Sequence, residues 1–208
     1  MDGLRGIASL VVLNFHLANQ VSDGTVEAPA WFRSSLEALV GSPLGVFFNG
    51  PLAVHFFFFL SGFALFAGYK WEPQKLRTYY LGRITRLYLP VWPALLIALV
   101  VALVSSPQDA TSGQMPVFSE PYGILKSATL IAGVGMALPA LWSLTWEIWF
   151  SFTLPFLKRF WPHRINFWIA FAVLTIVMIS GDLLKVGVLR YGPMFVLGAL
   201  VQAKWLDI

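Results

Sequence analysis

Apolar residues dominate this chain and form long runs that short polar stretches separate. The runs cover residues 4–17, 46–67, 88–104, 124–138, 140–155, 165–180 and 186–203. Because about 20 apolar residues in a helix cross a bilayer, the runs predict an all-α fold, a polytopic transmembrane helix bundle with six or seven membrane segments. Residues 31–40 are more amphipathic and predict a short helix at the membrane interface, with Trp31 at headgroup depth.

The composition agrees with a membrane protein. Hydrophobic residues make up 58% of the 208 residues and charged residues only 12%, whereas about a quarter of a soluble domain is charged. The net charge of +4 comes from clustered basic residues, so it does not indicate nucleic-acid binding. The chain has no cysteine, which excludes disulfides and thiolate chemistry. The lipid bilayer is therefore the first predicted partner.

Basic residues gather between the second and third runs and predict the topology there. The cluster contains Lys70, Lys75, Arg77, Arg83 and Arg86 against one acid, Glu72. By the positive-inside rule, we expect the loop 70–86 to face the cytoplasm and the loop 105–123, which has no basic residue, to lie outside. The run 124–138 is short and contains Gly133 and Gly135, so it predicts a broken or re-entrant helix and leaves the later topology open.

The opening segment carries polar groups that are costly in hydrocarbon, namely Asp2, Arg5 and His16. Arg5 and His16 are eleven positions apart. In a helix they point within roughly 20° of each other and lie ~16 Å apart along one face, with Ser9 on the same side. This predicts a polar seam that faces a cavity. The alternative is that these residues are flanking charges that reach the membrane boundary.

The second run combines four phenylalanines with a narrow, polar point. Leu60 follows the phenylalanines and precedes Ser61 and Gly62, small residues that allow another helix to approach closely. We interpret this pair as a packing feature. His55 lies earlier in the same run, and an imidazole at membrane depth needs a partner. A structural and a functional role are both open for it.

Two further groups are candidates for chemistry. Arg83 and Arg86 are neighbours on one helix face, and paired guanidiniums suit phosphate, although basic residues at a boundary also bind anionic lipid. Ser143, Glu147 and Ser151 recur every four residues and predict one polar face. An isolated carboxylate in this setting is expected to face the bundle interior and find a basic partner, unless it lies at the boundary and reaches water.

Four separated segments together resemble one family. They are residues 2–8 with His16, residues 57–63, residues 83–90 and residues 141–147, and residues 190–198 resemble a further family segment. In this order they resemble the integral membrane acyltransferase 3 family, whose members include O-acetylases of surface polysaccharides and nodulation-factor acyltransferases. We therefore expect residues 1–208 to form a single transmembrane acyltransferase-like domain that lacks C-terminal helices of the family.

The resemblance implies transfer of an acyl group, expected to be acetyl, from acyl-CoA to a hydroxyl of a carbohydrate or related acceptor such as a saccharide. His16 is then the candidate general base or acyl carrier. Arg5 neutralises donor charge or stabilises an oxyanion, and Glu147 orients or pairs with one of them. Arg83 and Arg86 hold the acyl-CoA phosphates, and no metal is expected. The alternatives are a small-molecule transporter or flippase and an inactive, truncated membrane partner.

Overall fold

The computed structural model describes residues 2–68, 72, 75–104, 122–131, 141–161 and 166–206, and the regular structure in these ranges is helical. The chain forms two compact units. The first unit combines Met1–Ala67 with Ile165–Ile208, and the second unit is Gly68–Arg164. Each unit is described by itself below.

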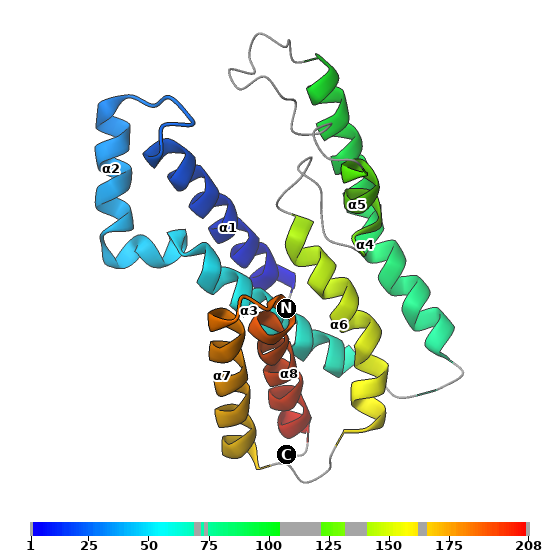
Figure 1. Ribbon diagram of the computed structural model, residues 1–208. Helices are drawn as coiled ribbons and strands as arrows, with labels where there is room; N and C mark the ends of the chain where they lie inside the picture. The colour runs from blue at the N-terminus through cyan, green and yellow to red at the C-terminus, as the bar shows by residue number, and fades with distance from the viewer. Residues whose placement is uncertain are drawn as a thin grey trace. The chain divides into compact units, whose positions relative to one another are not determined.

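The first unit holds both ends of the chain. Its elements are α1 (Asp2–Ser22), α2 (Ala30–Val40), the 3₁₀ helix η1 (Pro43–Phe48), α3 (Gly50–Gly68), α7 (Phe167–Leu183) and α8 (Gly187–Leu206). Figure 1 shows α7 and α8 side by side as an antiparallel pair. Side chains of Asn49 and Asn166 begin two of the helices, because their oxygens accept the orphan backbone N–H groups of Leu52 and Trp168, each at 3.0 Å.

Helices α3 and α8 touch through their backbones at two glycines. A Cβ on Gly62 would collide with the backbone of Phe195, and a Cβ on Gly198 would collide with the backbone of Phe59 and Phe63. Each glycine therefore makes room for the partner helix, as small residues do at helix crossings in membranes. The predicted close approach at Gly62 is confirmed.

The first helix is longer than the run 4–17 predicts. It continues through Ser22, five residues beyond the end of that run. Val21 is buried to 99% and belongs to a cluster with Leu36 of α2. Packing against α2 therefore stabilises the last turn of α1. The polar residues in this turn gave no sign of that packing in the sequence.

The second unit is built on α4 (Leu76–Val104), α5 (Gly123–Thr129) and α6 (Trp142–Arg159). Its core joins Leu87, Val91, Leu130 and Ile148. The prediction of a loop over residues 70–86 is wrong from Leu76 onward, because α4 already includes this part of the basic cluster. Arginine is a good helix former, and Tyr79 and Tyr80 fasten this first part of α4 to α6. Lys70 lies outside the described residues.

A proline in α6 explains one of these contacts. Pro155 lies inside the helix and has no N–H for the carbonyl of Ser151, four residues earlier. The hydroxyl of Tyr79 donates to that carbonyl at 2.9 Å. Tyr80 donates to the next carbonyl, of Phe152, at 3.2 Å, but that carbonyl also lies within reach of an ordinary helical N–H.

We therefore expect Tyr79→Phe to lower the free energy of unfolding of the second unit by about 0.5–1.5 kcal/mol, because a buried carbonyl loses its donor. Tyr80→Phe is the matched control and should cost less. Denaturant unfolding of both variants in detergent, followed by tryptophan fluorescence, measures the difference. Equal losses would contradict the role given to Pro155.

The helix at the start of the run 124–138 is short. Helix α5 ends at Thr129, and Leu130 adopts a left-handed conformation with φ of 55°. The ring N–H of Trp92 donates to the carbonyl of Ala128 at 3.3 Å, and the hydroxyl of Tyr88 donates to that of Thr129. Such partners are needed where a helix ends away from water. Residues 132–140, with the predicted glycine break, lie outside the described residues.

Two helices of the described ranges are long and apolar enough to cross a membrane, Gly50–Gly68 and Leu76–Val101, and Phe167–Leu183 is apolar but shorter. The all-α prediction is confirmed for the described residues, whereas the number of six or seven membrane segments stays a prediction. Helix α1 adds a stripe of exposed apolar side chains, formed by Leu4, Ile7, Leu10, Leu13 and Leu17. A stripe of this length is unfavourable in water and favours contact with lipid.

Candidate active site

Arg5 is held inside the first unit by α3. Its Nη2 donates to the hydroxyl of Ser61 at 2.8 Å, and its guanidinium carbon lies 5.7 Å from the ring centre of Phe57. Ser61 is fully buried. A hydrogen bond from a charged donor and a cation–π contact both stabilise a guanidinium away from water. This geometry favours an inward-facing arginine over one that reaches the membrane boundary.

His16 lies on the same helix as Arg5, toward the other end of α3. Its side chain is exposed, and its ring meets that of Phe15 edge to face at 5.4 Å. Phe15 packs against Gly50, where a Cβ would collide with its ring. Because Phe15 is near the start of α3 and Arg5 is near Ser61, α1 and α3 run antiparallel. The two candidate residues therefore lie at opposite ends of one helix pair.

The residues of the predicted polar seam of α1 therefore differ in burial. Arg5 is half-buried, whereas Ser9 and His16 are exposed. The hydroxyl of Ser9 donates to the backbone carbonyl of Arg5 at 3.0 Å, one turn back along the helix. The periodicity places all three on one side, but only the arginine reaches α3 in the contacts of this unit.

Glu147 is buried in the second unit. Its side chain is 5% exposed, Ser151 one turn later is 1% exposed, and Ser143 is half-buried. The predicted polar face of α6 is thus buried at Glu147 and Ser151. Glu147 belongs to the second unit and Arg5 and His16 belong to the first, so the pairing of Glu147 with either one stays a prediction.

Arg83 and Arg86 share one face of α4, as their spacing predicts. Arg83 is half-buried, with its guanidinium carbon 5.8 Å from the ring centre of Tyr79, and Arg86 is exposed. Tyr79 is itself anchored to α6, so Arg83 has an oriented support. The pair is the candidate cofactor-binding element. Within the described ranges, no group of three or more side chains that can hold a metal ion comes together.

Sequence reasoning missed Ser61 as the partner of Arg5. Ser61 is the only polar side chain between His55 and Tyr69, and an intramembrane arginine needs an acceptor. These two facts make Ser61 a candidate acceptor, although they do not show that α1 and α3 are neighbours. The small size of Ser61 suggested packing alone, and that interpretation holds for its neighbour Gly62.

Comparison with family models decides the relationship. A model described as an acyltransferase domain matches residues 1–208, the whole chain. The chain belongs to the acyltransferase 3 family. The acyltransferase 3 resemblance of the four motif segments is thereby confirmed, and the chain is a member of a membrane-associated transferase family. No curated protein and no solved structure matched the chain.

Proposed function

We propose that this acyltransferase 3 protein is a multi-pass integral membrane enzyme that moves an acyl group, in the first instance acetyl, from acyl-CoA to a hydroxyl of a carbohydrate or related acceptor. Six or seven membrane segments, with the segment 70–86 at the cytoplasmic face, are part of this proposal. The observation that carries it is the charged Arg5 held within the first unit by Ser61, on the same helix as an accessible imidazole, His16.

In this reaction His16 acts at the acceptor. Its imidazole takes the proton from the acceptor hydroxyl as the oxygen attacks the thioester carbonyl. The new carbon–oxygen bond forms, the carbon–sulfur bond breaks, and the coenzyme A thiolate leaves and receives the proton from the imidazolium. The products are the acyl ester and free coenzyme A, so atoms and charge balance.

The separation of Arg5 from His16 supports one of the two roles considered for the arginine. Reacting groups must lie about 3–3.5 Å apart, whereas Arg5 is fixed at Ser61 and His16 lies ~16 Å farther along α1. Arg5 is therefore assigned to the charge of the donor and not to the oxyanion that forms beside His16.

The donor is assigned to the basic residues. Arg83 and Arg86 hold phosphate groups through charge-assisted hydrogen bonds. Coenzyme A carries its phosphates and its thioester at opposite ends of a long arm, so the residues that hold its phosphates need not include the base. Glu147 is the proposed acidic partner of His16 or Arg5.

The test uses membrane vesicles that contain the full chain and acetyl-CoA labelled in the acetyl group. Label that appears on an added saccharide supports the enzyme, provided that vesicles without the protein give none. Movement of unmodified saccharide across the membrane instead would point to a transporter. The absence of both would point to an inactive membrane partner and would overturn the proposal.

Removing the two arginines together tests the donor site. Arg83→Ala with Arg86→Ala should weaken acyl-CoA binding by about 10- to 100-fold, because hydrogen bonds to charged groups contribute about 1.5–3 kcal/mol. Arg77→Ala, an exposed arginine in the first turn of the same helix, is the control and should bind normally. Isothermal titration with acetyl-CoA measures both. Unchanged affinity in the double variant would return the pair to contact with lipid headgroups.

A further inference from the structure

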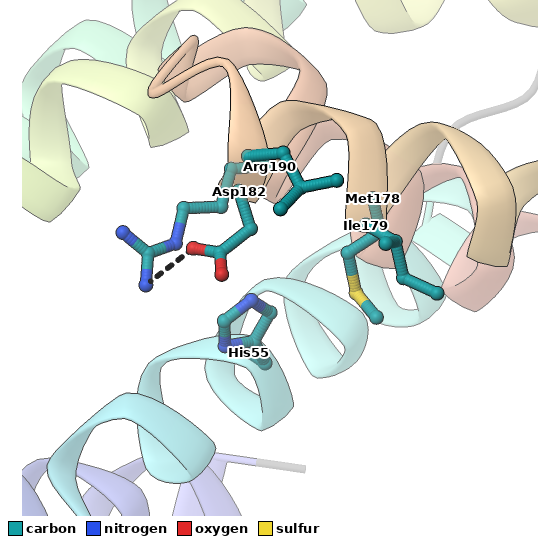
Figure 2. Close-up of a pocket in the computed structure, with 6 residues that line it drawn as sticks. His55, Met178, Ile179, Asp182 and Arg190 are labelled. Carbon is teal, nitrogen blue, oxygen red and sulfur yellow. Dashed lines mark ion pairs between the residues drawn. The ribbon is translucent and has the colours of Figure 1, made fainter.

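A pocket with three polar and three apolar lining residues opens in the first unit, apart from the residues assigned above. It has a volume of about 260 Å³ and lies between the early part of α3, the end of α7 and the start of α8. Its lining residues are His55, Met178, Ile179, Asp182, Leu183 and Arg190. Figure 2 shows His55 on α3 facing Asp182 and Arg190 across the pocket.

One wall of the pocket is an ion pair with spare hydrogen-bonding capacity. Nη2 of Arg190 lies 3.0 Å from Oδ1 of Asp182, and the guanidinium carbon lies 5.5 Å from the ring centre of Tyr191. Nε of Arg190 is buried and has no hydrogen-bond partner among the described residues. The side chains of Arg190 and Asp182 are still 34% and 53% exposed, so a ligand in the pocket can reach the guanidinium and the carboxylate, although not the buried Nε.

The opposite wall presents an acceptor. Nδ1 of His55 lies 2.7 Å from the carbonyl oxygen of Pro51. Because a carbonyl only accepts, Nδ1 carries the hydrogen, and Nε2 of the neutral ring keeps its lone pair. The ring packs 5.5 Å from that of Tyr191, which limits its rotation. The imidazole therefore offers Nε2 as an acceptor on the side of the pocket.

This combination selects the chemistry of a ligand. A hydroxyl group both donates and accepts hydrogen bonds, so it can donate to Nε2 of His55 or to the carboxylate of Asp182 while accepting from Arg190. A second hydroxyl of the same ligand can then bond to whichever of these donors and acceptors the first hydroxyl does not use. The ion pair cancels the formal charge of the wall, so an anion gains little there, and Met178 and Ile179 provide an apolar wall for carbon atoms.

The position of the pocket connects it with the proposed base. His55 lies five residues after Gly50, and Gly50 packs against Phe15, the neighbour of His16. Arg5 lies at Ser61, six residues beyond His55 in the other direction along α3. The pocket therefore lies on α3 between the part that packs against Phe15 and the part that holds Arg5. Helix α3 packs along α1 over this stretch, and α1 carries the proposed base.

We propose that the pocket of His55, Asp182 and Arg190 binds an uncharged polyhydroxylated compound, a sugar residue or polyol, and serves as the acceptor site. The role as acceptor site rests on the proposed function, whereas the binding itself does not. His55 is then a binding residue through Nε2, with Asp182 and Arg190 as the opposing pair.

Binding is tested without acyl-CoA by saturation-transfer NMR on the purified full chain in detergent, with methyl α-glucoside and glycerol as probes. The wild type should transfer magnetisation to at least one of them. His55→Asn places an amide nitrogen where Nδ1 stood, so it keeps a donor for Pro51 but loses Nε2. We expect it to weaken probe binding about fivefold, the loss of one hydrogen bond of about 1 kcal/mol.

Two controls separate binding from folding. Lys185→Gln changes an exposed charge in the turn between α7 and α8 and should bind the probe as the wild type does. His55→Gln returns a polar atom near the position of Nε2 and should recover part of the affinity. Matching circular dichroism spectra are required of all variants, and a variant that fails this check is replaced by Arg190→Lys, which keeps the positive charge but loses the branched guanidinium and should also weaken probe binding.

The outcomes are distinct. Failure of the wild type to bind either probe, tighter binding of inorganic phosphate, or equal binding by wild type and His55→Asn would each overturn the inference. Probe binding without any transfer of labelled acetyl overturns the proposed function and leaves the pocket intact as a polyol site. Transfer with an unchanged KM for the acceptor in His55→Asn overturns the acceptor role and leaves the enzyme.

Discussion

His16→Ala should reduce acyl transfer by about 10²- to 10⁴-fold, the range that a positioned general base contributes. The imidazole is exposed at the surface of α1 and contacts Phe15 by its edge, so its removal opens no core and the fold should be retained. Binding of acetyl-CoA should be unchanged, because the donor is assigned to Arg5 and to α4. Labelled transfer to saccharide and titration with acetyl-CoA measure the two quantities.

Asn19→Ala is the matched control for this variant. Asn19 is also polar and exposed on α1, nearly one turn after His16, and its change should leave transfer intact. Retained turnover in His16→Ala would remove the histidine from the mechanism. A rapid acid quench distinguishes the two chemical roles, because an acyl carrier leaves label on the wild-type protein while a base in direct transfer leaves none.

The helices could be predicted from the sequence because their apolar runs are long, but their ends depend on packing. Helix α1 keeps an extra turn through Val21. Helix α4 begins a full three turns before the apolar run at residue 88, since Tyr79 and Tyr80 find carbonyls on α6. Tyr79 and Ser151 are 72 residues apart in the sequence. Local periodicity does not reveal such a contact, so the sequence pattern predicted a loop for the basic segment.

For the candidate site, too, the sequence predicted relations within one helix but not contacts between helices. The helical period alone relates Arg5 to His16 and Arg83 to Arg86, because the residues of each pair share a helix. Their partners come from other helices. Ser61 meets Arg5 only because α1 and α3 are antiparallel, and the pocket of His55 needs α7 and α8 to fold back as a pair. No spacing in the sequence encodes those meetings.

For Glu147, the sequence predicted the burial of the side chain but not its partner. Its isolation among apolar residues predicts a buried carboxylate, and its exposure of 5% agrees with that expectation. Its proposed partner lies in the other compact unit, so the role depends on how the two units associate. A double-mutant cycle between Glu147→Gln and Arg5→Ala, measured on transfer rates, is the direct test of that coupling.

The second large effect is expected at the crossing of α3 and α8, where Gly62→Ala should lower the free energy of unfolding of the first unit by about 1–3 kcal/mol or more. The added Cβ collides with the backbone of Phe195. A backbone cannot rotate away as a flexible side chain does, so the two helices must separate. Separation also loosens the contacts of Phe58, which is fully buried.

Gly68→Ala provides a matched control, since Gly68 ends the same helix and a Cβ there meets nothing within 4 Å. Alanine favours helix over glycine by about 1 kcal/mol, so this variant should be neutral or slightly more stable. Denaturant unfolding in detergent, followed by circular dichroism, compares the two. Because Gly198 makes the reciprocal contact, Gly198→Ala should behave like Gly62→Ala, and a crossing held by side chains alone would instead give all three variants the same stability.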